Sequence, residues 1–250
     1  MTKPTAIAAG IAAAALTLSA CSQKEVTYQP EPAYSGKRPS LPAVPTLPNK
    51  AKKEGDSYTV WGAMHDLRSE VRRVDFDGKE VSIVGYIVKT NYDTACKDEK
   101  APEEGEECVP KCAVHKEGKA DPEGCAAPTP TFWIAESKDE KDHHTKAIPV
   151  KGWASNFAKI YSFIEALDKD EKAEMQDVFT GSNLPKPLPV VGAKVKVTGA
   201  YGETFSGASG GSASNPRTGI LGAKKIETTE AAAIIAVLPG MKVSNTPKKK

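Results

Sequence analysis

Four of the five cysteines in this 250-residue chain lie within a segment of thirty residues, and their type and spacing suggest chemistry most directly. The spacings are C-x11-C, C-x3-C and C-x12-C across Cys96, Cys108, Cys112 and Cys125. Thiolates in such a cluster could bind a metal ion, exchange disulfides or form structural bridges. Because no C-x2-C pair occurs, the spacing is not typical of a zinc ribbon or of a thioredoxin-type redox motif.

Histidines offer a second set of ligands nearby. His143 and His144 are adjacent in a charged segment, and His115 lies within the cysteine segment. Imidazoles bind transition metals, so metal binding by the cysteine and histidine loops is one interpretation, and simple exposure of these histidines is the other. The sequence contains no Ser nucleophile elbow, HExxH motif or phosphate-binding loop. We therefore expect no enzymatic activity and no cofactor.

The first twenty residues indicate where the protein is located. Lys3 is followed by an apolar stretch and then by small residues that lead directly to Cys21, which is typical of a secretory signal. The tail "LSAC" resembles the lipobox of bacterial lipoproteins, in which a leucine and two small residues precede the cysteine that is acylated. The resemblance implies that residues 1–20 are removed as a signal peptide and that Cys21 carries the lipid, palmitate included, that anchors the protein in the cell envelope.

Ser22 refines this expectation. In the lipoprotein pattern of a Gram-negative source, a serine rather than an aspartate after the cysteine favours the outer membrane over the inner one. The alternatives are an ordinary signal peptide cut nearby and a short membrane helix, although the apolar run is short for spanning a bilayer.

An exported location favours disulfide bonds in the cysteine segment. Disulfides persist outside the reducing cytosol, and an even number of cysteines there predicts a framework of bridges. We therefore expect two disulfides among Cys96, Cys108, Cys112 and Cys125. Four cysteines allow three pairings, of which we favour Cys96–Cys125 with Cys108–Cys112, because the outer bridge would close the base of the loop and the inner bridge its tip.

Composition divides the exported chain into a tether, one domain and a tail. Residues 21–52 are proline-rich and predict a semi-extended tether behind the lipidated cysteine. Residues 53–230 carry the apolar patterns of one domain, with 93–130 as an inserted loop, and 231–250 form a C-terminal tail that ends in three lysines. The formal net charge of the chain is only +2, but the inserted loop holds ten acidic and five basic side chains.

Within the domain, β-branched and aromatic residues cluster or alternate in five segments that predict strands. We expect Gly85 to mark a bulge or bend in the first of them. An apolar stripe at helical spacing from Trp153 to Leu167 predicts a helix, and Asp168 with Glu171 resembles a capping box that would open a second short helix to Phe179. The glycine- and serine-rich segment 203–219 predicts a flexible loop. The five predicted strands are 81–88, 132–135, 146–150, 192–203 and 220–227.

This order of three strands, a helix and two strands is similar to that of OB-fold domains in bacterial envelope proteins, over about residues 79–228. The resemblance implies a mainly β fold with one or two helices, arranged as a five-stranded OB-like Greek-key barrel with a long disulfide-bearing loop between its first two strands. That loop, and the long segment between the helix and the fourth strand, depart from the family pattern.

OB-folds present the face of their second and third strands to oligonucleotides or oligosaccharides, framed by two loops. The resemblance therefore implies five binding candidates, although Trp133 and Tyr86 also fit the core of a small barrel, and Tyr92 and Arg217 also fit plain exposure. The acidic loop would repel phosphates, which argues against nucleic acid. The candidates are Tyr86, Tyr92, Trp133, Tyr201 and Arg217.

The sequence thus favours a lipid-anchored, disulfide-stapled binding or assembly module of the cell envelope, without catalytic activity of its own. Its partners would be the membrane, through the N-terminal lipid, and a protein or glycan of the envelope. A periplasmic metal-binding protein is the first alternative, and an oligonucleotide- or oligosaccharide-binding domain is the second.

Overall fold

The chain divides into two units, Met1–Leu47 and Pro48–Lys250, and the fold below belongs to the second. A computed structural model describes residues 50–74, 76–207 and 212–242. The expected signal peptide, Cys21 and the tether as far as residue 49 lie outside the described residues.

The fold is mainly β. Its described residues form a mixed sheet of seven strands in the order β1-β2-β3-β4-β5-β11-β8, accompanied by four α-helices. The strands are β1 (Lys53–Glu54), β2 (Ser57–Thr59), β3 (Lys79–Thr90), β4 (Phe132–Ala135), β5 (Ala147–Lys151), β8 (Lys194–Gly202) and β11 (Ile220–Glu230). The five strand segments expected from the sequence correspond to β3, β4, β5, β8 and β11.

The sheet closes in part on itself, because β3 also pairs with β8. That antiparallel pairing runs from Lys79 opposite Tyr201 to Tyr86 opposite Lys194. Around the ring, β5 and β11 are parallel and the other neighbouring pairs are antiparallel. Alternate side chains of these strands point into the ring, as the period of two requires, and Ile83, Ile134 and Val197 are fully buried there.

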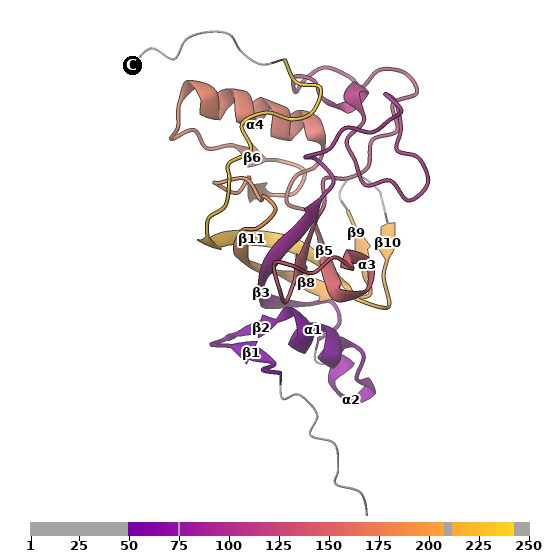
Figure 1. The fold of residues 1–250 in the computed structure, drawn as a ribbon, viewed down its shortest axis with the longest axis vertical. Coiled ribbons are helices and arrows are strands. Elements are labelled where there is room, and N and C mark those ends of the chain that lie inside the picture. Colours follow the sequence, from indigo (N-terminus) through magenta and orange to yellow (C-terminus); the bar gives the residue numbers. More distant parts are fainter. Residues whose placement is uncertain (1–49, 75, 208–211, 243–250) are drawn as a thin grey trace, which may run out of the picture. The chain divides into compact units, whose positions relative to one another are not determined.

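Helix α4 (Phe157–Lys169) carries the apolar stripe expected from the sequence. The side chain of Asn156 accepts a hydrogen bond from Lys159 N and begins the helix, so that Trp153 lies before it. The stripe buries Ile160 and Phe163 in the core, each worth roughly 1.5–3 kcal/mol of transfer free energy. Figure 1 shows α4 at one end of the sheet, and α1 (Val60–Leu67) and α2 (Glu70–Arg73) at the other.

Gly85 has a different role from the expected bulge. The pairing of β3 with β8 continues through Gly85, and the irregularity of β3 lies between Ile87 and Lys89 instead. A β-carbon on Gly85 would come within 2.7 Å of Val60 Cγ2, at the start of α1. Glycine is therefore needed here so that α1 can pack closely against the sheet.

The second helix expected from Asp168 to Phe179 does not form. Helix α4 continues through Asp168 to Lys169, and the following residues form a small hairpin of β6 (Gln176–Asp177) and β7 (Ser182–Asn183). The buried carboxylate of Asp177 accepts hydrogen bonds from Ser155 N, Phe179 N and Thr180 N. This side chain organises the hairpin turn in place of a helical hydrogen-bond ladder.

The glycine- and serine-rich segment is also more regular than expected. It contains an antiparallel hairpin of β9 (Thr204–Ser206) and β10 (Ser212–Ser214), which stands between β8 and β11 along the chain. None of the helices in the part of the chain that the structure describes has both the length and the apolar character that crossing a membrane requires.

Candidate functional site

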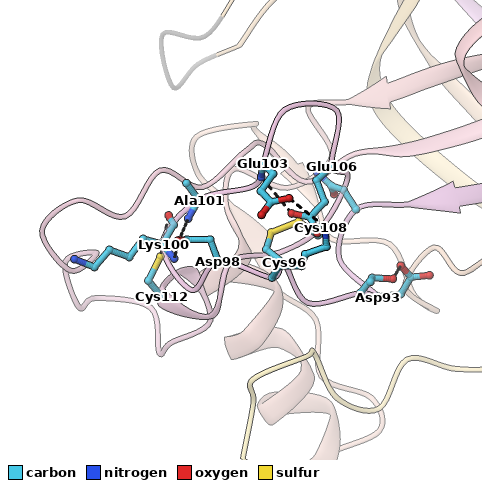
Figure 2. The surroundings of a disulfide bond; sticks show 12 residues. Asp93, Cys96, Asp98, Lys100, Ala101, Glu103, Glu106, Cys108 and Cys112 are labelled. Atoms are coloured by element: carbon cyan, nitrogen blue, oxygen red, sulfur yellow. Dashed lines mark hydrogen bonds and ion pairs between the residues drawn. A yellow bond between two sulfur atoms is a disulfide. The ribbon is translucent and has the colours of Figure 1, made fainter.

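The cysteines form two disulfides, but not in the favoured pairing. Cys96 is bonded to Cys108, and Cys112 to Cys125. The expectation of nested bridges was wrong because the segment does not form one long loop. It makes two successive small loops, with Cys96 N donating to Val109 O beside the first bridge. Figure 2 shows this bridge with Glu103 and Glu106 beside it.

The disulfide loop, residues 93–130, is docked onto α4. Val109 and Ala113, the latter in the short helix η1 (Lys111–Ala113), are buried in the core cluster. The ammonium of Lys159 is buried, and its Nζ lies 2.5 Å from Glu117 Oε1. Glu117 N also donates to Ser162 Oγ over 2.9 Å. The loop is therefore a packed part of the domain.

Two of the five expected binding residues are core residues. The side chains of Tyr92 and Tyr201 are fully buried, so they cannot contact a ligand at the surface. Their hydroxyls donate to Pro189 O and to Thr218 O, each over 2.7 Å. Burial raises the pKa of both phenols, since the charged form would be desolvated.

The other three candidates are at least partly exposed. Tyr86 and Trp133 are half-buried on the outer face of β3 and β4, where Lys194 Nζ lies 5.6 Å from the Tyr86 ring centroid. Trp133 packs edge-on against His143, with ring centroids 5.5 Å apart. Arg217 is exposed, and its carbonyl accepts a hydrogen bond from Arg68 Nε.

The histidines separate into two places. His143 and His144 belong to α3 (His143–Lys146), and His143 Nε2 lies 2.5 Å from Glu107 Oε2 of the disulfide loop. His115 instead pairs with Asp121 over 2.5 Å, within that loop. Burial alone would lower the pKa of His115, but hydrogen bonds to Asp121 and to Lys116 O outweigh it and raise the pKa.

A cleft of about 370 Å³ lies on the outer face of β5 and β11, next to the β9–β10 hairpin. In the parallel pairing of these strands Lys151 stands opposite Gly222. A β-carbon on Gly222 would approach Phe205 Cε2 to 2.7 Å, so the ring of Phe205 forms a close apolar wall. Phe179, on the β6–β7 turn, lines another part of the cleft and is 63% exposed.

The electrostatics of the cleft favour an anion. Lys151 is half-buried, and burial lowers the pKa of its ammonium without a described carboxylate or hydrogen bond to oppose the shift. Lys224, the other cation at the cleft, already pairs with Glu80 over 2.5 Å. No Asp or Glu lines the cleft among the described residues, whereas Ser155, Thr180 and Ser206 bring hydroxyls to it.

This cleft was not expected from the sequence. In the sequence Lys151 comes directly after the predicted strand 146–150, like many surface lysines, and only the fold makes it the last residue of β5, beside Gly222 and Phe205. The one available signal was the run of glycine and serine in residues 203–219, which predicted a flexible loop. Comparison of the chain with protein-family models and with curated proteins gave no match.

Proposed function

We propose that this protein is a lipid-anchored binding module of the bacterial cell envelope, and that its cleft around Lys151 receives an acidic group of a protein partner. It has no catalytic activity of its own and needs no cofactor. The observation that carries the proposal is the half-buried ammonium of Lys151, which has no anionic partner among the described residues and faces a cleft without carboxylates. An ammonium held in this way gains most from an incoming anion.

We also propose that the partly closed sheet is an OB-like barrel. Its support is the pairing order β3-β4-β5-β11-β8 with return to β3, together with the place of α4 between β5 and β8. In such a barrel the β9–β10 hairpin is the loop between the fourth and fifth strands, one of the two loops that frame the ligand face of OB-folds. The cleft lies against this hairpin.

A protein partner fits the surroundings of the cleft better than a nucleic acid or a glycan. Phe179 at its edge is 63% exposed and the preceding Val178 is 74% exposed, and together they offer apolar contacts of the kind found at protein interfaces. The volume of about 370 Å³ suits one or two side chains rather than a length of polymer. One unpaired lysine is also a weak attraction for a phosphate backbone, which is bound by several cations.

Anchoring is tested by the intact mass of the natively expressed, membrane-extracted protein. The proposal expects a chain that begins at Cys21 and carries two or three acyl groups, and a Cys21→Ala variant that leaves the membrane fraction. A native chain with an unmodified Cys21, or an unprocessed N-terminus, would refute the anchor.

Binding is tested by photocrosslinking in cells that naturally make the chain. A benzoyl-phenylalanine at position 179, at the edge of the cleft, should give a discrete protein adduct. The same group at Val71, 82% exposed on α2, is the matched control and should not give that adduct.

The variants Lys151→Glu and Lys151→Met should both abolish the adduct at position 179. Lys151→Met keeps a long side chain, and thermal unfolding verifies that the variant is folded. An adduct that survives both substitutions, an equal adduct from position 71, or crosslinking to polysaccharide alone would overturn the proposal.

A further inference from the structure

A cluster of ligand-type side chains lies outside the cleft, where the disulfide loop meets α3. The carboxylate of Glu107 faces both histidines of α3: its Oε2 lies 2.5 Å from His143 Nε2, and its Oε1 lies 3.8 Å from His144 Nδ1. One ligand atom from each of the three residues lies within 4.8 Å of the others. Glu107 and His143 are less than 20% exposed, whereas His144 is 66% exposed.

The fold holds these ligands in place from two sides. Glu107 directly precedes Cys108, which is 1% exposed and bonded to Cys96. On the other side, the carboxylate of Asp142 accepts a hydrogen bond from Thr145 N and begins α3. The ring of Trp133 supports His143 from β4. A site on two such supports needs little rearrangement to bind an ion.

We propose that Glu107, His143 and His144 form a binding site for a divalent transition metal of the Zn²⁺ type. Two imidazoles and one carboxylate are a donor set that zinc accepts, with further positions left for water or a ligand. The spacing supports this assignment, because two ligands bound at 2.0–2.2 Å with a tetrahedral angle lie about 3.4 Å apart. The separations are 2.5 Å from His143 Nε2 to Glu107 Oε2 and 3.8 Å from His144 Nδ1 to Glu107 Oε1, so the ion would replace the hydrogen bond of His143 and move its ring away from Oε2.

The cysteines do not belong to this site. Cys96, Cys108 and Glu106 form a second group of possible ligands, but both sulfurs are joined in a disulfide and supply no thiolate. The bound metal would clip the disulfide loop to the turn between β4 and β5. This site is independent of the cleft, so either proposal can fail alone.

The test uses the natively expressed, membrane-extracted protein, purified in detergent without a polyhistidine tag. Calorimetric titration with Zn²⁺ should give one site per chain, and Co²⁺ in its place should give ligand-field bands in the visible spectrum. The melting temperature should rise with Zn²⁺, because the metal binds only the folded arrangement.

His115 provides the matched control. Its side chain is 17% exposed, against 18% for His143, and each imidazole pairs with a carboxylate over 2.5 Å. We expect Glu107→Gln, His143→Ala and His144→Ala each to weaken binding at least about 10-fold, the lower bound for loss of outer ligands alone. His115→Ala should keep the affinity of the unmodified chain.

Because His144 is exposed, His144→Ala is the variant least expected to disturb the fold. If the variants at Glu107 and His143 unfold, the affinity of His144→Ala alone decides the outcome. A titration without a saturable site, unchanged affinity in His144→Ala, or an equal loss in His115→Ala would overturn the assignment.

Discussion

The ring of Phe205 lies so close to Gly222 that a β-carbon on Gly222 would come within 2.7 Å of Phe205 Cε2. Gly222 is a residue of β11, and Phe205 lies in the β9–β10 hairpin. Because Gly222 is the sheet partner of Lys151, this contact places the hairpin beside Lys151. A β-carbon on Gly152 would also come within 3.1 Å of Phe205 Cζ, so the wall of the cleft depends on the missing side chains of two glycines, with the closer approach at Gly222.

Gly222→Ala should therefore displace the hairpin. We expect faster hydrogen exchange at Asn215, whose amide donates to Glu203 O at the base of the hairpin, and a loss of about 1–2 kcal/mol of stability from overpacking. The variant Phe205→Ala removes the ring that the new methyl group meets. If the double variant shows the full sum of the two single losses, the contact does not hold the hairpin.

The disulfide pairing can be read from a tryptic digest without reduction. Cleavage after lysine places the four cysteines on four peptides: 90–97, 101–111, 112–116 and 120–138. The structure predicts that 90–97 is linked to 101–111 and that 112–116 is linked to 120–138. Any cross-link between the two sets, or four free thiols, would contradict the two successive loops.

Docking of the disulfide loop should depend on Glu117. Its replacement by Ala leaves the ammonium of Lys159, 7% exposed, without its carboxylate. We expect a loss of about 2 kcal/mol of unfolding free energy in urea. Glu104→Ala, which removes an exposed acid of the same loop, should cost almost nothing.

Adding Lys159→Met to Glu117→Ala removes the buried charge and should restore most of the stability. A double variant no more stable than Glu117→Ala would show that the cost does not come from the stranded ammonium.

The pair of His115 and Asp121 should make stability depend on pH. Because the folded pKa of His115 is raised from 6.5, the charged imidazole stabilises the fold below that pH, and this contribution is lost as the pH rises through the folded pKa. The difference in stability between the unmodified chain and His115→Gln should therefore be larger at pH 5.5 than at pH 8.5. An equal or larger difference at pH 8.5 would contradict the charged pair.

The strands of the ring could be predicted from the sequence because they depend on local pattern. In β8, Val195 and Val197 alternate with lysines and are buried, and β4 has the expected bounds, Phe132–Ala135. The stripe of α4 was equally clear, since its apolar residues recur at helical spacing.

The predictions that were wrong concern residues whose hydrogen-bond partners are distant in the sequence. The capping-box pattern at Asp168 and Glu171 predicted a second helix, which does not form. Instead, the carboxylate of Asp177 accepts hydrogen bonds from Phe179 N in the turn and from Ser155 N. Tyr92 was weighed as an exposed residue, yet its hydroxyl meets Pro189 O, which is distant in the chain.

The contacts that build the two sites are equally long-range. Glu107 and His143 are 36 residues apart in the sequence, and Lys151 and Gly222 meet only through the parallel pairing of β5 with β11. No local pattern carries such information.

The most direct measurement of the central claim is amine labelling of Lys151 in intact cells, compared with the purified protein. Burial lowers the pKa of this lysine, which favours the neutral amine that reacts with the label. Lys138, an exposed lysine outside the cleft, serves as the internal reference.

If the cleft holds an acidic partner group in the envelope, labelling of Lys151 relative to Lys138 should be several-fold lower in cells than in the purified chain. Equal relative labelling in the two samples would mean that nothing covers Lys151, and would contradict the cleft as the binding site.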